Sequence, residues 1–267
     1  MATIVFVHAH PDDEAGLTSG SMARASAEGH RVVLVVCTDG AHGETPDDLA
    51  EGETLVDRRR TESAASAAAL GIADVRWLGY RDSGMSGWPQ NADPDAFCRA
   101  DVDEAGERLA AVLREVAADV VVVYDWHGNY GHPDHVQVHR VGHRAADLAA
   151  TPRRYEATMN RDVMNRSREE LPEFDPEGEF DPNGPMDDGN PLGSTEAEIN
   201  LAVDVSAYLE HKRRAFTAHA SQVTDIGAML SMPPAVFDAF FGTEWYIVPG
   251  SDAPLHGGWL LDGVGAA

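Results

Sequence analysis

The chain opens with Ile4-Val5-Phe6-Val7-His8-Ala9-His10-Pro11-Asp12-Asp13-Glu14, an apolar run followed by a dense group of histidines and carboxylates. The run 4–7 is short and rich in β-branched residues, which predicts a buried strand. Residues 15–28 are rich in alanine and predict a helix. The polar residues between them therefore lie where a strand turns into a helix. In open α/β sheets, this carboxyl edge of the strands is where ligands bind.

The two imidazoles and three carboxylates of residues 8–14 are unfavourable neighbours unless a cation joins them. Imidazole and carboxylate suit zinc, which in catalytic sites binds three protein groups and one water. His10 and Asp13 are three residues apart, so on a first helical turn they would share a face and converge on one ion. The structural alternative is a set of acidic residues stabilised by the dipole at a helix N-terminus.

Later segments repeat the alternation of strand and helix. Apolar runs predict strands at 31–36, 75–78 and 120–124, and helical patterns predict helices at about 56–70, at about 101–117 and up to about 149. This order is typical of parallel βαβ units. We therefore expect an α/β fold with a Rossmann-like, doubly wound, mostly parallel sheet and helices on both faces.

The 267 residues are expected to form a single domain with three parts. These are a Rossmann-like core at 1–150, an acidic variable insert at 151–200, and a C-terminal helix and strand at 201–267 that complete the domain. Residues 169–193 carry nine acidic residues and no Lys or Arg, which predicts an exposed loop. In the last part we expect an edge strand at 202–205, a helix at 206–218 and a final strand at 245–248.

The formal net charge is −25, and Lys212 is the only lysine among 20 basic residues. Such a surface repels phosphate backbones and anionic lipids, so we expect neither nucleic acid nor a membrane as partner. No apolar run approaches the roughly 20 residues that span a bilayer. Cys37 and Cys98 fit neither a disulfide framework nor a thiolate zinc site. With no segment of signal-peptide type, a cytoplasmic location is expected.

A second group, His132-Pro133-Asp134-His135, follows the strongly apolar run 120–124. Since the carboxyl ends of parallel strands lie at one edge of a sheet, it should lie near His10 and Asp13. Proline fits the first position of a helix, where no amide donor is lost. His135 would then be a third metal ligand, with His139, one turn further on, as the alternative.

Together, Ala9-His10-Pro11-Asp12-Asp13-Glu14 and Gly131-His132-Pro133-Asp134-His135 resemble the PIG-L (LmbE-like) family of zinc-dependent N-deacetylases. Weaker similarity covers Arg59-x-x-Glu62, Arg81-Asp82-Ser83-Gly84-Met85 and His219-Ala220-Ser221-Gln222. Within the family, the run Tyr130-Gly131-His132 is most similar to the mycothiol-pathway deacetylases.

The resemblance implies one zinc ion per chain on His10, Asp13 and His135, although Fe2+ or Co2+ could occupy such a site as well. It implies further catalytic residues: Asp12 as general base, His132 as partner of the oxyanion and the leaving amine, Tyr130 as a mobile residue, and Asp134, which orients His132 or a ligand.

Substrate contacts are expected from Arg59, Arg81 and Asp82, although either arginine could instead pair with nearby carboxylates. His219 could be part of the site or simply core packing. Asp39, His42 and Glu44, which follow the strand at 31–36, could touch the substrate or only cap a helix.

The implied reaction removes an N-acetyl or other N-acyl group from an amino-sugar conjugate such as an N-acetylglucosaminide. Zinc lowers the pKa of its bound water from about 15.7 to about 7, and Asp12 would take the proton of that zinc-bound water. Either His132 or protonated Asp12 then supplies a proton to the amine. The alternatives are an amidase acting on a thiol conjugate or another acylated amine, and a non-catalytic metal- or sugar-binding protein. The expected partner is a small-molecule amino sugar, and the sequence leaves open whether the chain forms a homo-oligomer.

Overall fold

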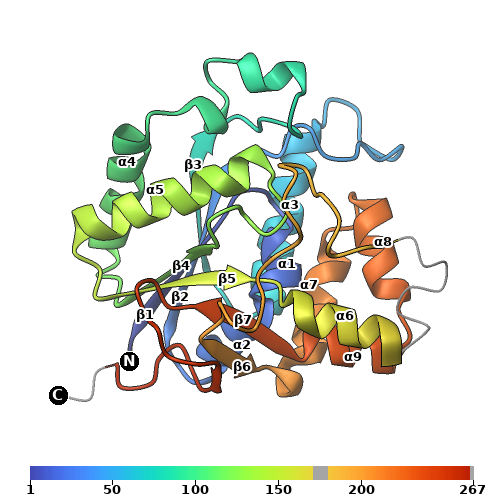
Figure 1. The fold of residues 1–267 in the computed structure, drawn as a ribbon. Coiled ribbons are helices and arrows are strands. Elements are labelled where there is room, and N and C mark those ends of the chain that lie inside the picture. Colours follow the sequence, from blue (N-terminus) through green and yellow to red (C-terminus); the bar gives the residue numbers. More distant parts are fainter. Residues whose placement is uncertain (171–179, 265–267) are drawn as a thin grey trace.

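Eight strands form one sheet in residues 1–170 and 180–264, which the computed structural model describes (Figure 1). The strands are β1 (Thr3–His8), β2 (Arg31–Thr38), β3 (Asp74–Tyr80), β4 (Val120–Tyr124), β5 (Arg153–Thr158), β6 (Leu201–Asp204), β7 (Thr243–Ile247) and β8 (His256–Gly257). The helices are α1 (Asp13–Leu17), α2 (Ser19–Ala27), α3 (Leu55–Ala69), α4 (Val102–Glu115), α5 (Pro133–Ala149), α6 (Arg161–Glu170), α7 (Leu209–Ala218), α8 (Val223–Ser231) and α9 (Pro234–Phe241).

The strand order is β3-β2-β1-β4-β5-β7-β6-β8. The first five strands are parallel, whereas β7 runs antiparallel to both β5 and β6. The chain winds from β1 outward to β3 and then places β4 on the other side of β1. The carboxyl ends of β1 and β4 therefore flank a topological switch point, where ligands bind in such sheets. The predicted doubly wound, mostly parallel α/β fold is confirmed.

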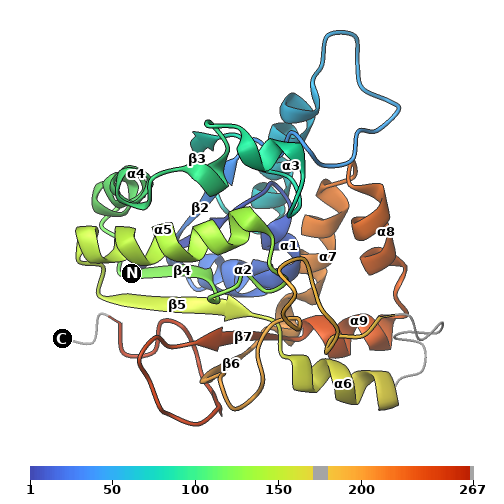
Figure 2. The same cartoon turned by 45° about the horizontal axis from the view of Figure 1, so that its top comes forward.

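Alternate residues of the central strands pack on opposite faces of the sheet. Ile4 and Phe6 of β1 face a core shared with α2, α3 and α7, and Val5 and Val7 face a core shared with α4 and α5. All four side chains are buried. Helices on both faces explain why these strands are continuous apolar runs rather than alternating ones. Figure 2 shows α4 and α5 together beside the strands, with α6 to α9 gathered at one side of the molecule.

The helix predicted at 15–28 is in fact two helices, α1 and α2, which meet at Thr18. The backbone of Thr18 is not helical, with φ −136° and ψ 0°, and its hydroxyl lies 2.8 Å from Nε2 of His8. His10 precedes α1, which begins at Asp13. The expectation that His10 and Asp13 share a helical face is therefore wrong, although their side chains do meet.

The second half of the chain differs most from expectation. Strand β5 was not predicted, because it begins with two arginines and its only apolar residues are Tyr155 and Ala157. Helices α6, α8 and α9 were not predicted either. Strand β6 lies between β7 and β8, so it is not an edge strand, and β7 is not the final strand. Residues 171–179 of the acidic loop lie outside the described residues, and the division into core and insert stays a prediction.

Candidate metal centre

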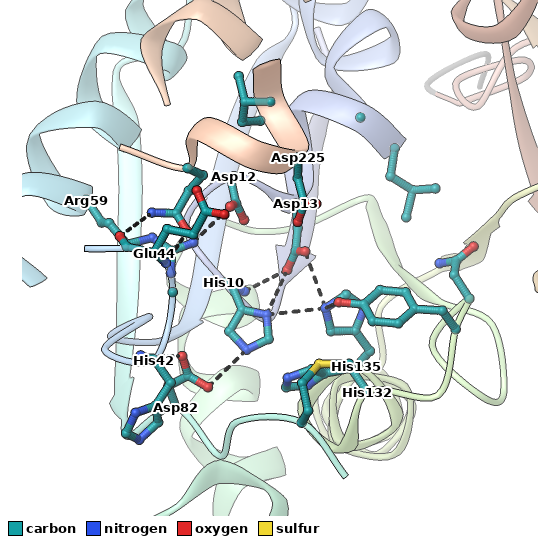
Figure 3. Close-up of a pocket in the computed structure, with 18 of the residues that line it drawn as sticks. His10, Asp12, Asp13, His42, Glu44, Arg59, Asp82, His132, His135 and Asp225 are labelled. Atoms are coloured by element: carbon teal, nitrogen blue, oxygen red, sulfur yellow. Dashed lines mark hydrogen bonds and ion pairs between the residues drawn. The ribbon is translucent and has the colours of Figure 1, made fainter. Parts of the chain in front are cut away.

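Side chains from the ends of β1 and β4 converge at the switch point (Figure 3). Nδ1 of His10 lies 3.5 Å from Oδ2 of Asp13 and 3.3 Å from Nε2 of His135. The same Nε2 lies 3.3 Å from Oδ1 of Asp13. Tetrahedral zinc with nitrogen and oxygen ligands at about 2.1 Å holds neighbouring ligand atoms about 3.4 Å apart. The three residues therefore fit a zinc-sized ion.

His132 also lies within reach, since nitrogens of His10, His132 and His135 are within 4.8 Å of one another. Its Nδ1 accepts a hydrogen bond from the backbone N–H of Asp134 at 3.1 Å, so Nε2 carries the proton of the neutral ring. Burial, His10 and His135 lower the pKa of His132 to about 2. His132 is thus a neutral hydrogen-bond donor beside His10, Asp13 and His135. The structure does not bring His139 into this group, because its Nδ1 contacts the carbonyl of Tyr124.

Two carboxylates contact the far nitrogen of His10. Nε2 of His10 lies 3.2 Å from Asp134 and 3.5 Å from Asp82, and Asp134 also accepts from the backbone N–H of Ser83 at 2.9 Å. Burial alone would lower the pKa of His10, but these acids and Asp13 raise it well above its usual value. Carboxylates that contact a ligand histidine in this way fix its ring. The carboxylate of Asp134 therefore contacts His10, whereas its backbone N–H contacts the ring of His132.

Tyr124 is a site residue that sequence reasoning missed. Its hydroxyl donates to Oδ2 of Asp13 at 2.9 Å and accepts from the backbone N–H of Ala9 at 3.1 Å, while Nδ1 of His8 lies 2.8 Å away. Its ring stacks on His135 with centroids 4.6 Å apart. Burial, followed by Asp13, raises the Tyr124 pKa well above its usual value, so the hydroxyl keeps its proton. Its place at the end of an apolar strand was the available clue.

Asp12 has an unusual backbone conformation, with φ 135° and ψ −24°. Its N–H donates to Oε2 of Glu14 at 3.2 Å. Nη2 of Arg59 donates to the Asp12 carboxylate at 2.9 Å and to the carbonyl of Pro11 at 2.6 Å. A strained residue persists only where its surroundings hold it, and such residues cluster at active sites. Burial raises the pKa of Asp12 to about 6 against the opposing effect of Arg59, close to the value that suits a general base.

A buried pair supports this turn from behind. Oε1 of Glu14 lies 2.6 Å from Nε2 of His219 and accepts from the hydroxyl of Ser66 at 2.6 Å. Neither Glu14 nor His219 is exposed to solvent. His219 follows α7, so the C-terminal part of the chain holds the strand-to-helix turn at the N-terminus. His219 was expected either in the site or in the core; its side chain is buried, pairs with Glu14 and does not line the cavity described below.

The loop before His132 sets the direction of His135. Nδ1 of His135 lies 3.2 Å from the carbonyl of Gly128, so Nδ1 carries the proton and Nε2 is left free to bind a metal. Gly128 has φ +67°, and a Cβ there would meet the Cβ of His135 at 2.2 Å. Only glycine allows this close approach. The hydroxyl of Tyr130 is 3.4 Å from Nε2 of His135, which places it at the same point.

A cavity of about 450 Å³ opens onto these residues. Of the expected substrate contacts, Arg59 and Asp82 line it, whereas the side chain of Arg81 is 62% exposed, pairs with Asp93 at 3.1 Å and is not in the lining. His42, Glu44 and Trp88 also line it. The second half of the chain adds lining residues that we did not predict: Met159, Phe216, Gln222, Asp225, Ile226 and Met229.

Residues 5–146 match the PIG-L family, described as GlcNAc-PI de-N-acetylase. A 1D-myo-inositol 2-acetamido-2-deoxy-alpha-D-glucopyranoside deacetylase from Thermobispora bispora is 39% identical over an alignment of 292 positions. The alignment covers 97% of this chain and 96% of that protein. The chain belongs to the PIG-L family. The predicted resemblance is thereby confirmed, and it extends over nearly the whole of this PIG-L chain.

Solved structures share the fold of this PIG-L chain at low identity. N,N'-diacetylchitobiose deacetylase from Pyrococcus horikoshii has a TM-score of 0.61 at 22% identity, over 92% of this chain and 83% of that one. The 4-carboxy-2-hydroxymuconate hydratase from Pseudomonas putida has a TM-score of 0.57 at 17% identity, over 94% of this chain and 97% of that one. One fold thus occurs in a deacetylase and in a hydratase, so the reaction has to be argued from the site. Among the described residues, no helix is both long and apolar enough to cross a bilayer.

Proposed function

We propose that this PIG-L chain is a metal-dependent N-deacetylase that acts on an amino-sugar conjugate. The observation that supports this most directly is the close approach of His10 and His135, whose nitrogens lie 3.3 Å apart, to the carboxylate of Asp13 beside Asp12. One oxygen of Asp13 is 3.5 Å from His10 and the other is 3.3 Å from His135. We assign one zinc ion per chain to these three residues. His132 is the weaker choice of ligand, because a carboxylate offsets the charge of the ion and a neutral imidazole does not.

A zinc ion held there would polarise the amide carbonyl and lower the pKa of a water molecule. Asp12 takes the proton from the attacking water and passes it to the nitrogen of the leaving amine. A pKa of about 6 suits both steps, because the carboxyl group can gain and lose a proton near neutral pH. The N–H at Nε2 of neutral His132 donates a hydrogen bond to the developing oxyanion. This assignment makes Asp12, rather than His132, the acid.

The charge of the cavity favours a neutral substrate. Carboxylates of Asp12, Asp13, Glu44, Asp82 and Asp225 line it. Among the described residues of the lining, Arg59 is the only lysine or arginine, and its guanidinium is already paired with Asp12 at 2.9 Å. Even with a zinc ion bound, these five carboxylates outweigh the charge of the ion and of Arg59, so the cavity disfavours a phosphate on the substrate. We therefore propose a sugar or polyol aglycone without phosphate, which agrees with the name of the Thermobispora relative.

A second candidate function follows from the apolar side of the same cavity. Leu17, Phe216, Ile226 and Met229 line it. An apolar wall of this kind would bury a group less polar than inositol. It therefore supports the alternative of an amidase that acts on a thiol conjugate or another acylated amine.

Release of acetate from a panel of substrates tests both proposals. The panel contains N-acetylglucosaminyl-inositol, its phosphorylated form, N,N'-diacetylchitobiose and an S-alkylated cysteinyl amide of glucosaminyl-inositol, for which release of the amine is measured. We expect hydrolysis of the neutral amino sugars, little of the phosphorylated one, loss of turnover with a chelator and recovery with zinc. Turnover that survives complete removal of metal would contradict the metal-dependent reaction. Faster cleavage of the cysteinyl amide would select the second candidate.

We also propose a cytoplasmic location and a small-molecule substrate. The strongly acidic composition supports the absence of a nucleic-acid or membrane partner. Homo-oligomer formation stays a prediction.

A further inference from the structure

A second group of metal-ligating side chains lies at the middle of α5. His139 and His143 are one helical turn apart on α5, and Glu156 comes from the adjacent strand β5. Nε2 of His143 is 2.7 Å from Oε1 of Glu156, and Nδ1 of His139 is 3.6 Å from the same oxygen. The two imidazole centroids are 4.5 Å apart. One ligand atom from each residue lies within 4.8 Å of the others.

We propose that His139, His143 and Glu156 form a second divalent-cation site, which binds zinc. Histidines at positions i and i+4 of a helix share a face, so two imidazoles can bind one ion. A carboxylate from a neighbouring element completes a set of two histidines and one glutamate, which is a donor set of zinc. None of the three residues belongs to the first centre.

The hydrogen bonding of His139 leaves one nitrogen free for a metal. Its Nδ1 is 3.1 Å from the carbonyl oxygen of Tyr124, which can only accept, so Nδ1 carries the proton. Nε2 then keeps a lone pair for the ion and has no hydrogen-bond partner in residues 1–170 and 180–264, while the contact of 3.6 Å with Glu156 is made by the protonated Nδ1. Histidine ligands commonly donate their second nitrogen to a backbone carbonyl in this way.

The carboxylate of Glu156 is buried where a positive partner would stabilise it. Tyr155 and Ala157 point to one face of the sheet, so Glu156 points to the other, towards the core beneath α5. Its side chain is only 11% exposed, and a carboxylate this buried is costly without a positive partner. The side chains of His139 and His143 are 23% and 22% exposed. An ion can therefore enter from solvent and keep a water as its fourth ligand.

The positive charge of Arg154 disfavours a cation at the second site. Its Nη1 lies 3.5 Å from Nδ1 of His143, while its Nη2 donates to Asp147 at 2.6 Å. When zinc binds Nε2 of His143, the proton on that nitrogen moves to Nδ1, and Arg154 keeps its bond to Asp147. Removal of the arginine removes a like charge near the ion. Arg154→Ala should therefore bind the second zinc more tightly than the wild type.

Zinc stoichiometry tests the proposal on the full chain. After equilibrium dialysis against zinc chloride, we expect two zinc ions per wild-type chain, one in His143→Ala and one in Asp13→Ala. His256→Ala, which removes an exposed histidine of β8, is the matched control and should keep two. Glu156→Gln keeps the shape of the side chain and should also bind one, with a circular dichroism spectrum that matches the wild type.

Cobalt gives an independent readout. Titration of cobalt chloride into Asp13→Ala should produce a tetrahedral absorption band that is absent from the Asp13→Ala/His143→Ala double variant. A wild-type chain that saturates at one zinc would overturn the proposal, as would a second zinc that survives both His143→Ala and Glu156→Gln. Acetate release by His143→Ala loaded with one zinc should match the wild type, since the first centre is intact. Failure of the second site is therefore distinguishable from failure of the proposed reaction.

Discussion

Replacement of Glu14 with glutamine should destabilise the chain, because it breaks the buried pair behind Asp12. Burial alone would raise the pKa of Glu14, but His219 and Ser66 hold it at about 2. Burial alone would likewise lower the pKa of His219, and Glu14 raises it instead. Both side chains are fully buried, so the pair is ionic and shielded from solvent. Glutamine keeps the volume and removes the charge, which leaves His219 without its counter-ion.

Loss of one partner of a buried ion pair costs roughly 3–5 kcal/mol. Glutamine still accepts a hydrogen bond from Ser66, and His219 can lose its proton, so we expect roughly 3 kcal/mol, at the lower end. For a domain of this size, 1 kcal/mol shifts the melting temperature by roughly 2–4 °C, which gives a drop of roughly 6–12 °C. Turnover should fall as well, because the same carboxylate accepts the N–H of Asp12.

Thermal unfolding of Glu14→Gln, followed by circular dichroism at a fixed zinc concentration, measures the effect. The metal has to be held constant because binding to the native state adds to the apparent stability. Glu28→Gln is the matched control. Its surface ion pair with Arg24 contributes little, so the variant should melt within about 2 °C of the wild type.

The double variant Glu14→Gln/His219→Gln should be less destabilised than the sum of the two single variants, since each alone leaves a partner unpaired. Strictly additive effects, or a melting temperature of Glu14→Gln equal to that of the wild type, would refute this account of the turn.

Three further variants test the metal centre. Asp12→Ala should keep its zinc, measured by elemental analysis, and lose turnover by roughly 10²–10⁴-fold, and an active variant would show that Asp12 is not the base. His135→Ala should lose turnover and the zinc of the first centre; retention of stoichiometric zinc at that centre would exclude His135 as a ligand. Tyr124→Phe removes the hydrogen bond to Asp13 at 2.9 Å and should weaken zinc binding by roughly 10–100-fold in a competition assay with a chelator, whereas an unchanged affinity would mean that the hydroxyl does not orient Asp13.

The central part of the fold was predictable because its strands are buried on both faces and appear as unbroken apolar runs. The strand predicted at 120–124 has those bounds in the structure, and the strands at 31–36 and 75–78 differ only at their ends. The order of strands and helices then required a parallel sheet, and parallel strands bring their carboxyl ends to one edge. That step alone predicted that His10 and Asp13 meet His135, although they lie more than a hundred residues apart.

Strand β5 and helices α8 and α9 were missed for a different reason. Strand β5 carries Glu156 and two arginines, so its burial on the sheet depends on neighbours that local composition does not reveal. Helix α8 is short and begins only a few residues after α7, yet it supplies Ile226 and Met229 to the cavity.

The order of residues was enough to predict the fold class, the edge of the sheet where the site forms, and the kinds of side chain that meet there. The spacing of apolar residues and the order of the predicted strands and helices can be read along the chain, and they suffice for these conclusions. The folded structure was needed to show that Tyr124 hydrogen-bonds to Asp13, that Glu14 pairs with His219, and that His139 contacts Glu156 and not the first centre. Contacts of about 3 Å between distant residues depend on how whole elements pack, and no pattern within one element specifies that packing.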